Sequence, residues 1–165
     1  MSVATKSQIM QATAALMLTV DPSPSTALQA AYVTPDDVYP SYDVDLSSSN
    51  LPVCIVGEAV AEPEEITHQL AGRAVYRWQM ELLFFLSDGL ADTEIKQAKM
   101  EAVRSPWPVA VADVLFQNKS LGFTGLKLDY NFRIVAGHLG WAEKPYYGFR
   151  MLVPVEQAYV QAMSR

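Results

Sequence analysis

The chain has 165 residues, of which 50% are hydrophobic and 18% charged, and its formal net charge at pH 7 is −6. This length supports one domain with a single core and is short for two, so we expect one domain over residues 1–165. Because Lys and Arg supply most of the affinity for phosphate backbones, an acidic chain without a basic stripe is poorly suited to grip nucleic acid.

The charge is unevenly distributed along the chain. Residues 1–72 contain nine acidic residues and one basic residue, Lys6, whereas residues 73–165 contain nine acidic and eleven basic residues. The two halves can therefore attract each other, either within one subunit or head to tail between neighbouring subunits. The low charged fraction and the many aromatic residues indicate apolar surface kept for a partner, which favours an oligomer.

A cytosolic setting without membrane spans is expected. The single cysteine, Cys54, permits no internal disulfide and lies in an apolar run, where it is typical of a small buried side chain. Gln8 and Gln11 interrupt the apolar N-terminal stretch, which argues against a signal sequence. Elsewhere, the longest strictly apolar run, Leu82–Leu86, is far shorter than the roughly 20 residues that cross a bilayer.

The first expected element is a helix at about residues 5–18, with apolar residues at helical spacing. The prolines that follow Asp21 end it, since proline cannot continue the hydrogen-bond ladder. Residues 19–50 then form a long Pro-, Ser- and Asp-rich connection with turns at 34–37 and 47–50. A connection of that length is usually functional or mobile.

Two strands are predicted next, at 51–61 and 74–87, separated by a polar connection that follows Glu62 and extends to Arg73. The second strand alternates apolar and polar residues, and its polar face becomes apolar only at Leu83 and Phe85. Those two residues therefore require a cover, either another element of the same chain or a neighbouring subunit.

A proline-broken helix is expected in the middle of the chain. Asp92 can cap a helix that begins at Thr93, and the prolines within 105–108 interrupt it. A second helical piece follows at 109–117, and residues 118–125 are rich in turn formers.

The predicted fold ends in two strands. Residues 126–136 alternate as a half-buried strand, 137–145 form a loop, and 146–155 return as the last strand with Pro154 at an edge. Residues 156–165 are a short helix or a tail. The element order α-β-β-α-β-β predicts an α+β fold, with a mainly antiparallel four-stranded sheet and helices packed on one face.

No motif points to catalysis, a metal or a cofactor, so we expect no enzymatic activity. Glu64 and His68 stand four residues apart, but one carboxylate and one imidazole are too few metal ligands. Cys54 with a histidine imitates a nucleophile and base, yet a thiol in an apolar strand is usually inert. The glycine pairs at 122–125 and 137–140 lack the residues of a phosphate-binding loop and indicate turns.

Two sets of side chains are candidates for surfaces. Arg77, Lys127, Arg133 and Arg150 occupy polar strand faces and form a basic surface if those strands adjoin, or otherwise an ordinary solvated sheet face. The candidate partner interface consists of large apolar and aromatic residues near loops or on the half-covered strand. Its members are Trp107, Trp141, Tyr146, Tyr147, Leu83 and Phe85. The alternative is that the loop aromatics fold back and cap the end of the core.

The order of elements resembles the tail terminator (tail completion, or head-tail joining) proteins of long-tailed bacteriophages. The resemblance covers most of residues 5–157 and rests on the N-terminal helix, the Pro-rich acidic connection and three strand segments. These segments are Leu51–Val56, Tyr76–Leu82 and Tyr147–Val153. The chain departs from short members of the family in its longer connection at 19–50 and in the proline-broken helix.

The resemblance implies a structural virion protein that assembles in the host cytoplasm. Such a protein forms a hexameric ring on the last ring of tail-tube protein, ends tube polymerisation and offers its other face to the head connector, or stopper, protein. Genome DNA passes through the lumen without specific binding, and no cofactor or catalytic residue is implied. The alternatives are another neck or tail component, such as a head-completion or tail-tube protein, or a small-ligand enzyme or binding domain whose pocket gathers His68, His138 and the acids.

Overall fold

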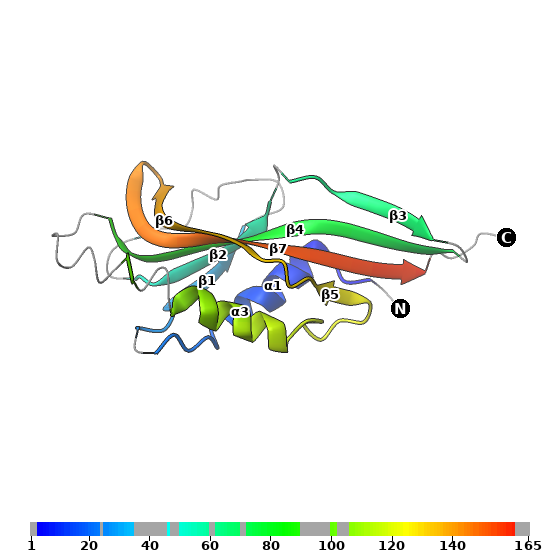
Figure 1. The fold of residues 1–165 in the computed structure, drawn as a ribbon, viewed down its shortest axis with the longest axis horizontal. Coiled ribbons are helices and arrows are strands. Elements are labelled where there is room, and N and C mark those ends of the chain that lie inside the picture. The colour runs from blue at the N-terminus through cyan, green and yellow to red at the C-terminus, as the bar shows by residue number, and fades with distance from the viewer. Residues whose placement is uncertain are drawn as a thin grey trace.

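A computed structural model describes residues 3–23, 25–34, 46, 50–59, 62–69, 72–89, 100–101 and 106–160. Its central feature is one curled, mixed seven-stranded sheet. Helices α1 (Lys6–Met17) and α3 (Trp107–Gln117) both lie on the same side of this sheet (Figure 1).

The sheet is built around β4 and β7, which pair antiparallel from Arg73 opposite Val160 to Asp88 opposite Tyr146. β2 and then β3 lie along the outer side of β4, and β6 and β5 lie along the outer side of β7. β1 runs parallel to β2. The strands are β1 (Ala30–Val33), β2 (Val53–Glu58), β3 (Glu65–Gln69), β4 (Arg73–Asp88), β5 (Leu126–Leu128), β6 (Arg133–Trp141) and β7 (Lys144–Val160).

The predicted four-stranded, mainly antiparallel sheet is therefore wrong. Each of the four predicted strand regions contains strand, but the connection at 19–50 also contains β1, and the polar connection before Arg73 contains β3. Both additions lie at sheet edges, where a strand needs no regular apolar alternation. The region 126–136 is divided into β5 and β6, which pair with different parts of β7.

The predicted loop at 137–145 is wrong as well, because β6 and β7 form a tight hairpin there. Its two turn residues, Ala142 and Glu143, have φ values of 47° and 65°. Left-handed conformations at both positions match the right-handed twist of the flanking strands. Gly137 and Gly140 accordingly lie within β6 rather than in a turn.

β7 also extends beyond its predicted end. It reaches Val160, so residues 156–160 are strand rather than helix or tail, and residues 161–165 lie outside the described residues. Pro154 was expected at an edge but lies within β7, at the point where the neighbouring strand changes from β6 to β5. Its carbonyl accepts a hydrogen bond from the Asp129 amide at 2.9 Å. The missing proline N–H thus faces the gap between the two strands, where it interrupts no ladder.

The predicted helix at 5–18 is confirmed. Thr5 accepts a hydrogen bond from the Gln8 amide, and the Gln8 side chain accepts one from the Thr5 amide, which forms a capping box. α3 begins two residues before the predicted 109, with Pro108 in its first turn, where a missing N–H costs little. The predicted start of the preceding helix, at Asp92 and Thr93, lies outside the described residues.

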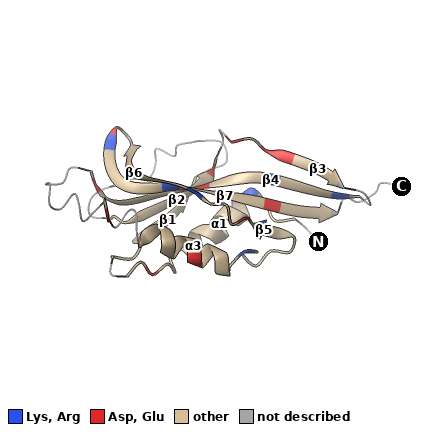
Figure 2. Ribbon diagram, in the orientation of Figure 1, with Lys and Arg blue, Asp and Glu red and all other residues tan. Residues whose placement is uncertain are grey.

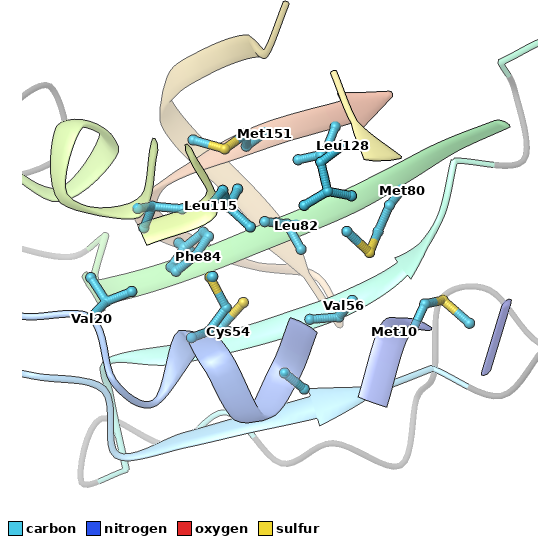
Figure 3. Packing of buried hydrophobic residues seen from close by; sticks show 14 of the residues in the cluster. Met10, Val20, Cys54, Val56, Met80, Leu82, Phe84, Leu115, Leu128 and Met151 are labelled. Carbon is cyan, nitrogen blue, oxygen red and sulfur yellow. The ribbon is translucent and has the colours of Figure 1, made fainter. Parts of the chain in front are cut away.

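The main core lies between the sheet and the helices (Figure 3). Alternate β4 residues from Trp78 to Phe84 point into it, as do the β7 residues opposite them. Phe84 and Phe149 stack with their ring centroids 4.4 Å apart. Because side chains alternate along a strand, the residues between these positions point to the opposite sheet face, which neither α1 nor α3 covers (Figure 1).

Candidate functional site

We call the sheet face opposite the helices the open face. A row of side chains with alternating charges crosses this face. Four cross-strand neighbours form it on β5, β7, β4 and β3: Lys127 lies opposite Glu156, Glu156 opposite Arg77, and Arg77 opposite Glu65. The Nε atom of Arg77 lies 3.0 Å from Glu156 and its Nη1 atom 3.8 Å from Glu65. These side chains are more than a third exposed, so each pair contributes little stability. The row instead leaves this part of the face nearly neutral.

A second ion pair lies closer to the middle of the same face. The Nε atom of Arg150 on β7 lies 2.5 Å from the Oε1 atom of Glu81 on β4. The Glu81 side chain is only 6% exposed, whereas that of Arg150 is 34% exposed. A buried carboxylate is costly without a cationic partner, so Glu81 depends on Arg150 more than Arg150 depends on Glu81.

The four basic residues singled out in the sequence therefore share one sheet face. Arg133 points to this face because it lies opposite Leu152 of β7. Leu152 is two residues from Arg150, so both point to the same face. Arg77 and Arg150 are paired with acids, so the face carries mixed charges instead of a basic patch. Such a face offers nucleic acid little net attraction.

Four of the six candidate interface residues lie together at the other end of the open face. Phe85 contacts the rings of Trp141 and Tyr146, each with centroids 5.5 Å apart, and Leu83 belongs to the same cluster. The Tyr146 hydroxyl donates a hydrogen bond to the carbonyl of Leu46 at 2.7 Å. The β6–β7 hairpin and Leu46 thus cover Leu83 and Phe85 from within the chain.

The other two candidates, Trp107 and Tyr147, are buried in the core on the helix side. All six candidate side chains are thus interior in the single chain. This placement matches the alternative in which the aromatics cap the core. That a partner protein binds near these residues stays a prediction.

Three of the exposed apolar residues lie on the outer strands β3 and β6, whereas others, such as Val109 and Phe116, lie on α3. Ile134 and Val135 of β6 are 41% and 63% exposed, and Ile66 of β3 is 56% exposed. Sequence reasoning missed all three. Ile134 was expected within a half-buried strand at 126–136, and Ile66 in the polar connection before Arg73. Their exposure follows from lying on outer strands, and a strand pattern alone does not reveal that position.

The two histidines do not meet. His68 on β3 lies opposite Ala74, and His138 on β6 lies opposite Tyr147, which neighbours Ser87 of β4. Ala74 and Ser87 are thirteen residues apart on one strand, which corresponds to about 40 Å at the usual rise per residue. Among the described residues, no group of three His, Cys, Asp or Glu side chains is placed to hold a metal ion. Cys54 is fully buried, and burial raises the pKa of its thiol well above the ordinary value.

A network of charged side chains joins the start of α1 to the sheet. The Nζ atom of Lys6 lies 2.5 Å from Glu58 on β2 and 2.6 Å from Glu64, and Tyr76 on β4 donates a hydrogen bond to Glu64 at 2.5 Å. Hydrogen bonds with Glu58, Lys6 and Tyr76 lower the pKa of Glu64 to about 2. Burial and the neighbouring Glu64 raise the pKa of Glu58 above its usual range. The network anchors the start of α1 to β2 and β4.

Comparison with known proteins assigns no family. No protein-family model and no curated protein matches this chain. In the described ranges, no helix has both the length and the hydrophobicity that crossing a membrane requires.

Proposed function

We propose that this chain is a structural virion protein that forms a ring of about six subunits at the head-proximal end of a phage tail tube. The ring ends tube polymerisation and joins the tail to the head connector. The proposal rests on the resemblance of the element order to tail terminators and on the surfaces that the sheet presents.

The observation that carries the proposal is a pair of different sheet edges on opposite sides of the β4–β7 pair. In the part of the chain that the structure describes, β3 pairs only with β4, and β6 pairs only with β7. A head-to-tail ring requires two unlike, complementary surfaces on each subunit. Figure 2 shows acidic residues at the start of β3, which include Glu64 and Glu65, whereas Arg133 begins β6.

The open face also supports a place beside the genome. Two of its arginines are paired with carboxylates on neighbouring strands, Arg77 with Glu156 and Arg150 with Glu81. DNA that slides past such a face meets little net attraction, since phosphate binding requires unneutralised Lys and Arg.

The separation of the histidines weighs against the alternative of a small-ligand enzyme or binding domain. That alternative requires His68 and His138 to share one pocket, and they lie about 40 Å apart along the sheet at the usual rise per residue. That alternative predicts that replacement of both histidines by alanine abolishes the activity of the domain.

The direct test combines the purified protein with the tail-tube protein of the phage that encodes it. We expect light scattering to give a particle of about six times the 18.2 kDa subunit mass, either alone or after the tube protein is added. Negative-stain images should show capped tubes that are shorter than those of the tube protein alone. A protein that stays monomeric and leaves tube growth unchanged contradicts the proposal. Long tubes formed by this chain alone would instead identify it as a tube protein.

A further inference from the structure

We infer that neighbouring copies of this chain join edge to edge, with β6 of one copy pairing antiparallel with β3 of the next. This inference deepens the proposed ring by naming the strands that close it. It rests on the outer edges of these strands, their directions and the exposed side chains that they carry.

The directions of β3 and β6 make their pairing antiparallel when the two copies have the same orientation. β3 is antiparallel to β4, β4 to β7, and β7 to β6, so β3 and β6 run in opposite directions within one copy. When two copies lie side by side with the same face outward, β6 of the first copy meets an oppositely directed β3 of the second. Antiparallel pairing is also the more stable arrangement per residue.

On both edges, the even-numbered residues point their backbone N–H and C=O groups outward, so they can hydrogen-bond to one another. The Ala59 amide donates to the Gln79 carbonyl, so odd-numbered β4 residues hydrogen-bond toward the side of β2 and β3. Their β3 partners are also odd-numbered, which leaves the backbone N–H and C=O of Ile66 pointing outward. On the other side, the Pro154 carbonyl accepts from Asp129, so even-numbered β7 residues bond toward β5 and β6. Their β6 partners are odd-numbered, which leaves the backbone groups of Ile134 pointing outward.

The side chains select one register. Ile66 lies opposite Tyr76 and Ile134 opposite Met151, so both isoleucines point to the helix side of the sheet. Placing Ile66 opposite Ile134 of the next copy pairs two outward-pointing backbones and covers two exposed apolar side chains. The outward-pointing backbone groups also permit registers shifted by two residues. Those registers separate Ile66 from Ile134 of the next copy.

The same register brings Glu65 next to Arg133 of the neighbouring copy, in the geometry of the Glu81–Arg150 ion pair within one copy. Glu65 then lies opposite Val135, and Arg133 is its diagonal neighbour on the open face. Glu81 lies opposite Leu152 and is bonded to Arg150 in the same diagonal relation. Opposite-charge pairs between neighbouring strands stabilise a sheet modestly and strengthen its preference for one register.

Cysteine cross-linking tests the register directly. In a hydrogen-bonded antiparallel pair the Cα and Cβ atoms lie about 5.5 Å apart, which is long for a direct disulfide but within reach of a short thiol-bridging reagent such as dibromobimane. We expect the double variant Ile66→Cys/Ile134→Cys, treated with that reagent in dilute solution, to give a ladder of covalent multimers on a denaturing gel. Ile66→Cys/Val109→Cys places the second thiol at an exposed position on α3 and should give no ladder. Variants that carry only one of the two introduced cysteines should give dimers at most, since the native Cys54 is buried.

Proline substitution tests the hydrogen bonds. Ile134→Pro removes an outward N–H and leaves the bonds between β6 and β7 in place, whereas Ile134→Val keeps the N–H and the branched shape. We expect the proline variant to be a folded monomer by circular dichroism and light scattering, and the valine variant to assemble. If the proline variant fails to fold, the cross-link still decides.

The outcomes separate this inference from the proposed function. A ring that forms without the 66–134 cross-link, or that persists in a folded Ile134→Pro variant, overturns the edge pairing and leaves the terminator proposal standing. A cross-linked ring that does not stop tube growth supports the edge pairing and contradicts the terminator proposal.

Discussion

At the scale of single residues, the Glu81–Arg150 pair should respond unequally to loss of either partner. Arg150→Ala leaves a nearly buried carboxylate without its cation, and we expect it to lower the free energy of unfolding by about 2–3 kcal/mol. Glu81→Gln leaves a partly exposed guanidinium that water can solvate, and we expect a loss of about 1 kcal/mol. Urea unfolding of both variants measures the difference. Equal losses would show that Glu81 is hydrated once Arg150 is removed.

Among the described glycines that lie within strands, Gly148 leaves the least room for a larger residue. A Cβ atom there would collide with the backbone carbonyl of Phe84 on the neighbouring strand, and backbone cannot move aside as a flexible side chain does. We expect Gly148→Ala to cost about 3 kcal/mol or to prevent folding. Gly140→Ala is the matched control, since no atom lies within 4 Å of its added Cβ, and its effect should stay within about 0.5 kcal/mol. Thermal unfolding of the two variants compares them.

At the scale of elements, the start of α1 depends on its capping box. Thr5→Ala removes the acceptor for the Gln8 amide, and we expect a loss of about 1 kcal/mol in unfolding free energy. Thr5→Ser keeps the hydroxyl and should retain most of the stability. An alanine variant as stable as the serine variant would mean that the Lys6 network alone holds this helix end.

The sequence predicts some elements and misses others for identifiable reasons. α1 and β4 are visible because their apolar residues recur at helical or strand spacing. β3 is invisible because an outer strand with one neighbour needs no alternating apolar face, and its sequence is mostly polar. The β6–β7 hairpin was missed because Ala142 and Glu143 are not the Asn-Gly or Asp-Gly pair that usually marks such a turn.

The candidate site is less predictable than the fold. Trp141, Tyr146 and Phe85 were recognised as side chains that need a partner, and the partners that the structure shows are one another. Which aromatic covers which core is decided by tertiary pairing of residues far apart in the chain. The exposure of Ile66 and Ile134 has the same origin, since it depends on which strands become outer strands.

At the scale of the whole molecule, the Lys6 network makes stability depend on acidic pH. The folded pKa of Glu64 is about 2, below its ordinary value of 4.5, so its contribution is present above pH 4.5 and lost as the pH falls toward 2. The raised pKa of Glu58 has the opposite sign, and its contribution is lost as the pH rises through the folded value. We expect Glu64→Gln to be less stable than the parent at pH 7, with the difference narrowing toward pH 2.

Thermal unfolding between pH 2 and pH 7 measures this dependence. Glu143→Gln changes a carboxylate in the exposed β6–β7 turn and serves as the control. If the difference in stability between the Glu64→Gln variant and its parent stays constant from pH 2 to pH 7, then Glu64 does not cause the loss of stability in acid.

The position of β7 also constrains the order of events during synthesis. β7 pairs with β4, β5 and β6 at once, yet it is made after all three. Until residues 144–160 leave the ribosome, the nascent chain carries a long apolar β4 with one side unsatisfied, and sheets closed by such distant contacts form slowly. Recombinant yield should therefore improve when a chaperone shields that intermediate.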